Sequence, residues 1–331
     1  WLRLPTTTTR LLMRSSIPCE VVSGTVAGQY ARDIRHEPSE GSGMADSLIG
    51  VHALVWVGDW GAESRRLATE STAAAGYGLI EIPAFAPKEI DVEGTRRDLA
   101  AAGLACSLSL GLDHGTDINS EDVSCVERGR DTLLDALRLA QDLGAIYLGG
   151  VIFGALDRYT APTTPRARAN SVSVIRELAQ EAANAGIPIG LEFVNRYESN
   201  LLNTARQTLD FIEDVGSENL YVHADVYHMN IEETDYRTPI LECGERLGYV
   251  HVGESHRGYL GSGTIDFPEF FGALREINYA GPITFESFSS SVVDENLSNR
   301  LAIWRNLWSD SSDLAIHART FIEAGMAGSS R

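Results

Sequence analysis

The sequence contains almost no lysine. Lys88 is the only lysine among the 331 residues, and every other basic residue is an arginine. Schiff-base and pyridoxal chemistry therefore have a single candidate nucleophile. Because Lys88 stands between Pro87 and Glu89, the local sequence predicts an exposed loop there. The scarcity of lysine argues against an enzyme that works through an imine.

Cysteine is also scarce, and long apolar runs are missing. The four cysteines, Cys19, Cys106, Cys125 and Cys243, are widely scattered and show no paired spacing of the zinc or redox kind. They indicate buried thiols in a reducing compartment, so we expect a cytoplasmic protein. No run reaches the roughly 18 apolar residues that a membrane span requires, and we predict no membrane partner.

Positive charge is the third deficit. The chain has 46 acidic and 27 basic residues, for a formal net charge of −19. A nucleic-acid binder normally presents a basic face to phosphate, so we predict no nucleic-acid partner. With 44% hydrophobic and 22% charged residues, the composition is that of an ordinary globular protein.

Residues 1–43 differ from the rest of the chain. Four successive threonines and scattered arginines occur there, and no hydrophobic periodicity does. An arginine-rich and threonine-rich start could be a transit peptide. Because the chain begins with Trp1, the segment could also be a fragment or an upstream translation. We interpret residues 1–43 as a disordered extension that has no catalytic part and need not belong to the native protein. Met44 precedes the first patterned segment and is the natural start that this pattern favours.

From Met44 onward, short apolar runs alternate with longer amphipathic segments. Eight runs have the character of buried strands, and their first residues lie 26 to 42 positions apart, which leaves room for one helix in each gap. These runs are Ile49–Trp56, Leu79–Ile82, Ala105–Leu110, Ile146–Val151, Pro188–Glu192, Leu220–Asp225, Tyr249–Val252 and Ile283–Glu286. Residues 44–331 are therefore predicted to form a single (β/α)₈ TIM barrel with a C-terminal helix, here placed over Ala302–Ala324. A doubly wound sheet is the alternative, but no Gly-x-Gly-x-x-Gly follows the first strand.

Four consecutive strand candidates each carry a polar residue at the end of an apolar run. These residues are Glu192, Asp225, His251 and Glu286. In a barrel they would converge at the carboxyl ends of the strands, where active sites lie. Three carboxylates and an imidazole would repel one another unless a cation lay between them, and this donor set suits Mn²⁺, Co²⁺ or Mg²⁺. Each acid could instead be structural, paired with an arginine or capping the next helix.

The loops that follow these strands contribute a second group of polar residues. Glu198, His228 and Arg257 would lie over the metal group, although His228 could be a satisfied loop histidine and Arg257 a surface partner of Glu254. His223, two residues before Asp225, is predicted to belong to the core or to support the ligands without binding metal. His52, on the first strand, could belong to the core or to the site.

A glycine-rich turn follows the seventh strand. Residues 257–263 could cradle a phosphate, since barrels often bind phosphate near their last strands. The simpler interpretation is a turn before Asp266, which would cap a helix over Phe267–Ile277. No second basic residue accompanies Arg257, so we expect an unphosphorylated substrate.

Four stretches make the sequence resemble a known group. They are Leu191–Glu198, Asp225–Glu233, His251–Arg257 and Phe285–Phe288. They resemble the D-tagatose 3-epimerase family of ketose 3-epimerases, which includes the L-ribulose and D-allulose 3-epimerases and belongs to the xylose-isomerase-like barrels. The resemblance extends from about residue 48 to the C-terminus. It implies that Glu192, Asp225, His251 and Glu286 bind one Mn²⁺ or Co²⁺, and that the chain forms a homodimer or homotetramer.

The resemblance also implies a reaction. Glu192 and Glu286 would act as an acid and base pair that inverts C3 of a free ketose through an enediolate. Glu198, His228 and Arg257 would hold the oxygens at the C1 and C2 end of the sugar. The first strand departs from the family's aromatic-rich segment, so substrate preference stays open. The alternatives are an aldose-ketose isomerase of the xylose or hydroxypyruvate isomerase type, and a barrel that binds sugar without turning it over.

Overall fold

Eight parallel strands close into a barrel in the computed structural model, which describes residues 47–328. The ring closes because β1 pairs with both β2 and β8. The strands are β1 Ile49–His52, β2 Leu79–Pro83, β3 Ala105–Leu112, β4 Leu148–Ala155, β5 Ile189–Glu192, β6 Leu220–Asp225, β7 Leu247–Val252 and β8 Ile283–Phe285. The predicted (β/α)₈ class is confirmed. The predicted extension over residues 1–43 lies outside the described residues.

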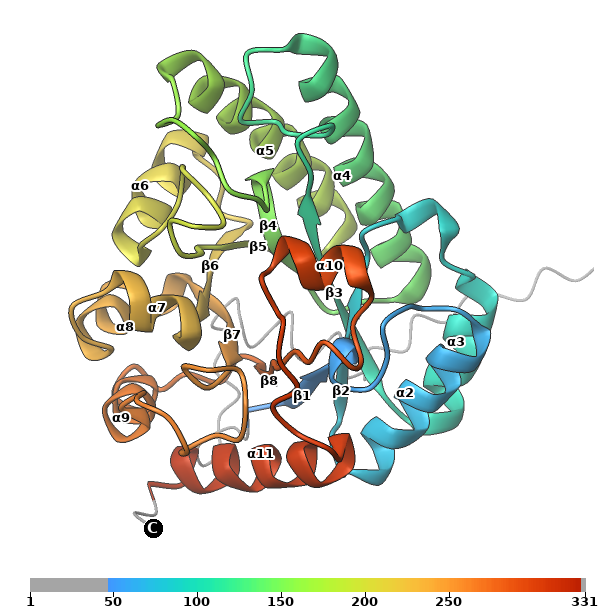
Figure 1. The fold of residues 1–331 in the computed structure, drawn as a ribbon. Coiled ribbons are helices and arrows are strands. Elements are labelled where there is room, and N and C mark those ends of the chain that lie inside the picture. The colour runs from blue at the N-terminus through green and yellow to red at the C-terminus, as the bar shows by residue number, and fades with distance from the viewer. Residues whose placement is uncertain (1–46, 329–331) are drawn as a thin grey trace, which may run out of the picture.

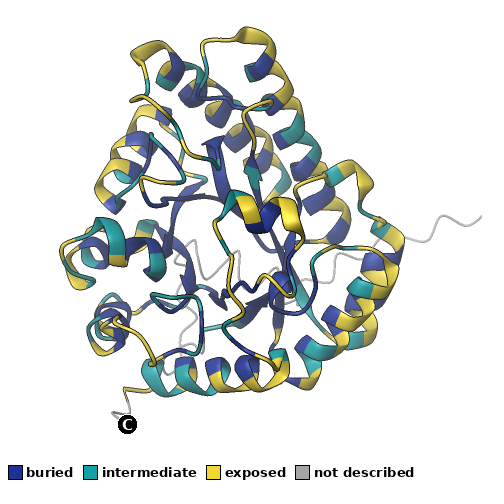
Figure 2. Cartoon of the chain, in the orientation of Figure 1, coloured by how far each residue is buried: buried dark blue, intermediate teal, exposed yellow. Residues whose placement is uncertain are grey.

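Helices surround the barrel and fill the gaps between the strands (Figure 1). They are α2 Ala62–Ala74, α3 Val92–Ala102, α4 Val123–Leu143, α5 Pro165–Ala185, α6 Ala205–Val215, α7 Val226–Glu232, α8 Arg237–Cys243, α9 Phe267–Glu276, α10 Glu295–Arg300 and α11 Ser311–Met326. Figure 1 looks at the barrel end on, with α10 in front of the strands. Figure 2 shows the strands buried and the outer helix faces exposed, as expected for a parallel sheet covered on both faces.

Several helices end at a glycine, among them α4, α5 and α6. Gly144, Gly186 and Gly216 follow α4, α5 and α6 with φ angles of 68°, 70° and 72°. A residue with a Cβ is strained in this left-handed region, so glycine is the usual choice there. Each glycine ends its helix at the point where the chain turns back to begin the next strand.

Several predicted boundaries are wrong, among them the fourth strand, which runs over Leu148–Ala155 instead of Ile146–Val151, and two of the differences have clear local reasons. The first strand ends at His52 instead of Trp56, because the His52 Nδ1 accepts a hydrogen bond from the Leu54 N–H at 3.2 Å and caps a short 3₁₀ turn. The C-terminal helix begins at Ser311 instead of Ala302. Asp310 sets that start, since its carboxylate accepts hydrogen bonds from the N–H groups of Ser312 and Asp313.

The glycine-rich turn after β7 serves as a turn. The Glu254 carboxylate accepts hydrogen bonds from the backbone N–H groups of Ser255 at 2.8 Å and Gly261 at 2.9 Å, which ties the loop together. Asp266 then caps α9 by accepting from the Glu269 N–H at 3.0 Å, as predicted. The loop's own carboxylate therefore takes up N–H groups that a phosphate would need.

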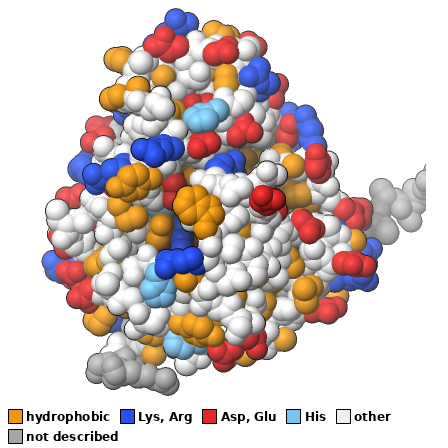
Figure 3. All heavy atoms as spheres, in the orientation of Figure 1, with side chains coloured by type: hydrophobic (Ala, Val, Ile, Leu, Met, Phe, Trp, Pro, Cys, Tyr) orange, Lys and Arg blue, Asp and Glu red, His pale blue; other side chains and the backbone are white. Residues whose placement is uncertain are grey.

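The sequence deficits have structural counterparts in the described part of the chain. Cys106, Cys125 and Cys243 are free and buried, and Cys19 lies outside that part. None of the helices within residues 47–328 is long and apolar enough to cross a membrane. Acidic and basic side chains are interspersed over the face in Figure 3, with no broad basic patch there.

A buried ion pair joins α2 to α3. The Arg65 side chain is 2% exposed and donates from Nε to Asp98 Oδ2 at 2.6 Å. Its guanidinium holds the pKa of Asp98 below the usual value. We expect Asp98→Asn to lower the free energy of unfolding by about 2 kcal/mol, because it weakens the charge-assisted hydrogen bond of a buried guanidinium. Urea unfolding followed by circular dichroism measures this.

Asp91→Asn is the matched control for Asp98→Asn. Asp91 also contacts Arg65, at 3.3 Å, but its side chain is 60% exposed, so its loss should cost less than about 1 kcal/mol. Asparagine keeps the cap that Asp91 provides for α3. Equal losses in the two variants would contradict the importance of burial for this pair.

Candidate metal centre and active site

Four polar side chains meet at the carboxyl end of the barrel. Glu192 ends β5, Asp225 ends β6, His251 lies on β7 and Glu286 directly follows β8. Each offers one ligand atom, and these atoms all lie within 4.8 Å of one another. All four residues are buried. The structure therefore brings together the four residues that the sequence analysis selected for a metal.

A fourth carboxylate, which the sequence analysis missed, lies beneath this group. Glu81 is in the middle of β2, and its two oxygens lie 3.0 and 2.9 Å from His251 Nε2. His251 Nδ1 faces the other way, 3.2 Å from Glu192 Oε1 and 3.6 Å from Glu286 Oε1. A carboxylate that accepts from one ring nitrogen of a histidine leaves the other nitrogen for a metal. Glu81 thus orients the imidazole toward the other ligands.

Burial and neighbouring charge shift the pKa values of these groups in different directions. Burial raises the pKa of Glu192 to about 7 and that of Asp225 to about 6. Burial acts the same way on Glu286, but the positive charges of His251 and Arg257 outweigh it and hold the pKa of Glu286 below its usual value. Burial opposes the charged form of His251, yet Glu81, Glu286 and Glu192 raise its pKa well above 6.5.

These shifts predict that metal binding depends on pH in the neutral range. Lowering the pH from 8 to 6 should weaken Mn²⁺ binding at least about tenfold, because a metal needs the ionised carboxylates and Glu192 becomes protonated near pH 7. The proton that Mn²⁺ must displace from His251 acts in the same direction. Titration of free Mn²⁺ by electron paramagnetic resonance (EPR) measures the affinity. An affinity that is flat from pH 8 to 6 would contradict the prediction.

Arg257 lies inside this group and not on the surface. Its Nη1 is 3.3 Å from Asp225 Oδ2 and 2.5 Å from Glu286 Oε2, and its guanidinium stacks 3.8 Å from the Tyr227 ring centroid. The interpretation of Arg257 as a surface partner of Glu254 is therefore wrong. Arg257 has a φ of 63°, a left-handed conformation that no feature of the local sequence indicates.

Asn195 joins the other two loop residues. Its side-chain nitrogen donates to Glu198 Oε1 at 2.8 Å and lies 2.9 Å from His228 Nδ1, which also accepts from the Asn195 backbone N–H at 3.2 Å. Because His228 Nδ1 accepts, its proton is on Nε2, which lies 3.5 Å from Asp225 Oδ2. Burial, with Arg257 nearby, lowers the pKa of His228 well below 6.5, so the ring is neutral. His228 is thus a fixed hydrogen-bond donor.

Two adjoining cavities open onto these residues. One, of about 150 Å³, is lined by Glu198, Tyr227, Arg257 and the segment 301–307 among others. The other, of about 50 Å³, has Glu192, His251 and Glu286 in its wall. A groove of about 280 Å³ between α9 and α11 is larger but lies away from the ligand group. The chemistry therefore belongs to the two smaller cavities, where a small polar molecule would contact the ligand group.

Comparisons with known proteins agree with this geometry. Residues 70–310 match the family model of the xylose isomerase-like TIM barrel. The chain is 49% identical to a ketose 3-epimerase of Arthrobacter globiformis over 274 residues, which is 83% of this chain and 95% of the relative. It is 50% identical to an L-ribulose 3-epimerase of Methylomonas sp. (strain DH-1), over 83% of this chain and 96% of that relative.

A solved structure is also similar to this chain along most of its length. A crystal structure of a D-allulose 3-epimerase from Methylomonas sp. superposes with a TM-score of 0.84 at 49% identity, covering 85% of this chain and 98% of that one. Fold and site define an enzyme of the xylose isomerase-like TIM barrel family. Within it, the chain belongs to the ketose 3-epimerases, which are carbohydrate epimerases of the isomerase class.

Proposed function

We propose that the protein inverts C3 of a free ketose of the L-ribulose, D-tagatose or D-allulose type, through an enediolate. The main support is that two carboxylates, Glu192 and Glu286, approach one buried centre from β5 and from the end of β8. Inversion removes a proton from one face of C3 and returns a proton to the other face, which a single base reaches poorly. The relatives named ketose 3-epimerase and L-ribulose 3-epimerase support the same reaction.

The donor set fits a divalent metal. Three carboxylates and one imidazole, from Glu192, Asp225, His251 and Glu286, suit Mn²⁺, Co²⁺ or Mg²⁺ better than an ion that prefers thiolate. When bound, such an ion supplies Lewis-acid polarisation of the sugar's carbonyl and hydroxyl oxygens. Arg257 can balance only part of the negative charge, since a single guanidinium contacts Asp225 and Glu286.

Glu192 and Glu286 are suited to opposite roles in proton transfer. The lowered pKa of Glu286 keeps it ionised and able to accept the C3 proton, whereas Glu192, with a pKa of about 7, can carry the proton that is returned. Pairs of carboxyl groups whose surroundings separate their pKa values are typical of acid and base pairs. The two roles exchange when the reaction runs in the other direction.

Three further residues would bind the C1 and C2 end of the sugar. Arg257 and the His228 Nε2–H can donate hydrogen bonds to oxygens that gain negative charge in the enediolate, a form of stabilisation worth several kcal/mol in many enzymes. Burial raises the pKa of Glu198, so when protonated this carboxyl can both donate a hydrogen bond to a sugar hydroxyl group and accept one from it. Arg257 already contacts two carboxylates, which favours an unphosphorylated sugar.

A substrate panel tests the proposal. The metal-reconstituted protein is incubated with L-ribulose, D-tagatose, D-fructose and D-allulose in D₂O, and nuclear magnetic resonance (NMR) follows C3 inversion and the position of deuterium. We expect inversion of at least one ketose, with deuterium at C3. Inactivity on all four would overturn the proposal. Deuterium at C1 or C2 would instead indicate an aldose-ketose isomerase, and sugar binding without any exchange would indicate a non-catalytic barrel.

A further inference from the structure

His223 is a buried histidine that lacks hydrogen bonds. It lies on β6, is 1% exposed, and neither of its ring nitrogens has a hydrogen-bond partner among residues 47–328. The other buried histidines are held: His52 accepts from Leu54, His228 from Asn195, and His251 contacts Glu81. A buried polar group without a partner is unfavourable, so it needs a structural reason such as an ion.

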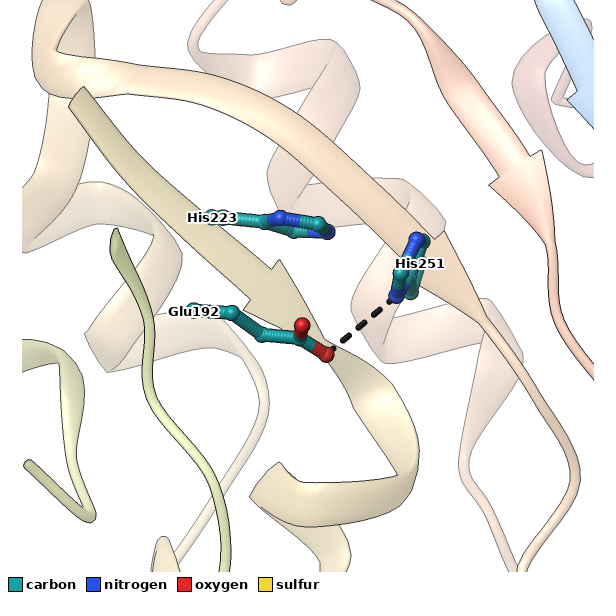
Figure 4. A group of neighbouring side chains, drawn as sticks. All are labelled: Glu192, His223 and His251. Carbon is teal, nitrogen blue, oxygen red and sulfur yellow. Dashed lines mark hydrogen bonds and ion pairs between the residues drawn. The ribbon is translucent and has the colours of Figure 1, made fainter. Parts of the chain in front are cut away.

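The His223 ring faces two residues of the site. Nitrogen atoms of His223 and His251 and a carboxylate oxygen of Glu192 lie within 4.8 Å of one another. The two imidazole rings cross at 75° with centroids 4.2 Å apart. Figure 4 shows the His223 ring beside the Glu192 side chain, with both directed toward His251. These three buried side chains form a small group of ligand atoms, in which His223 lies two residues before Asp225 on β6.

We propose that Glu192, His223 and His251 form a second, deeper seat for a divalent metal ion. The seat offers two imidazoles and one carboxylate, whereas the group of Glu192, Asp225, His251 and Glu286 offers one imidazole and three carboxylates. Imidazole suits Zn²⁺, Cu²⁺ and Ni²⁺, and carboxylate suits Mn²⁺ and Mg²⁺. The deeper seat therefore takes the nitrogen-preferring ions, with Zn²⁺ as the representative.

The two seats exclude each other because they share Glu192 and His251. A Zn²⁺ ion in the deeper seat would prevent Mn²⁺ from using these two ligands and would engage one carboxylate of the proposed acid and base pair. Zn²⁺ is thus an inhibitor that competes with the activating ion. This inhibition rests on the proposed function, whereas binding at the deeper seat does not.

Copper is the probe that counts the imidazoles. In the metal-free, full-length protein with one equivalent of Cu²⁺, pulsed EPR should detect two coordinated imidazoles, and one in His223→Gln. His52→Gln is the matched control: it removes another buried histidine, which belongs to neither group of ligand atoms and whose ring packs edge-on against His251 with centroids 6.3 Å apart. It should leave two imidazoles. A single imidazole in the unaltered protein would overturn the proposal. Because this measurement uses the unaltered protein, it does not depend on whether a variant folds.

The affinities of the variant for Zn²⁺ and for Mn²⁺ provide the second measurement. His223→Gln should weaken Zn²⁺ binding at least about tenfold, the lower range for loss of one ligand or its support, while Mn²⁺ affinity changes less than twofold. If the variant bound both ions equally less tightly, or bound both as tightly as the unaltered protein, the result would contradict a separate seat. No sugar is present in these experiments, so they can fail while the epimerase assay succeeds, and the reverse.

Discussion

Replacing Glu192 or Glu286 with glutamine is expected to slow exchange of the C3 hydrogen with solvent deuterium by about 10²–10⁴-fold, the range for loss of a general acid or base. Glutamine has nearly the same shape as glutamate but cannot accept a proton at neutral pH. Both carboxylates lie in the buried ligand group, so water has poor access to replace them. NMR in D₂O follows the exchange for each variant with saturating Mn²⁺.

The control for these variants is Glu232→Gln. The Glu232 carboxylate, at the end of α7, pairs with Arg196 outside the ligand group, and its loss should leave exchange unchanged. EPR counts the bound Mn²⁺ in each sample, which separates loss of proton transfer from loss of the ion. Exchange at the unaltered rate in either Glu192→Gln or Glu286→Gln removes that residue from the acid and base pair.

Glu81→Gln should weaken Mn²⁺ binding by about 10–100-fold, although Glu81 is not among the four expected ligands. The amide can still accept from His251 Nε2, but it lacks the negative charge that makes the imidazole a better donor to a metal. Glu81→Ala should weaken binding further, because it removes the acceptor as well as the charge. EPR titration of free Mn²⁺ measures both variants.

Ser107→Ala is the matched control for Glu81→Gln. Ser107 is equally buried on the neighbouring strand, and its hydroxyl is hydrogen-bonded to Tyr249 at 2.7 Å, without contact to His251. Its loss should change Mn²⁺ affinity less than twofold. If Ser107→Ala weakens binding as much as Glu81→Gln, the effect comes from a disturbed core and not from the carboxylate.

The sequence predicted the barrel and its four converging residues because both depend on short-range patterns. Eight apolar runs with helix-sized gaps leave few architectures. A polar residue that closes a parallel strand must lie at the same edge as its equivalents on the neighbouring strands, so Glu192, Asp225 and His251 could be placed together without knowing any loop.

The missed features depend on distances that pattern alone does not supply. Glu81 lies in the middle of an apolar run, so it did not satisfy the rule of a polar residue at a strand end. The sequence did contain one signal for Glu81, a single carboxylate inside an otherwise apolar strand. An ionised acid is almost never fully buried without a partner, so this position could have indicated a charged partner nearby. The contacts of Arg257 depend on its left-handed backbone, which nothing in the local sequence requires.

The ion pairs around Arg257 and His251 bear on when the enzyme becomes active. Arg257 contacts Asp225 and Glu286, and His251, whose pKa is raised, lies between Glu81 and Glu192. Two cations of the chain itself thus separate the carboxylates that would otherwise repel one another. We therefore expect the chain to fold before any ion is bound. On the proposed function, the supply of metal would then set how much of the folded protein is active, without changing how much protein is present.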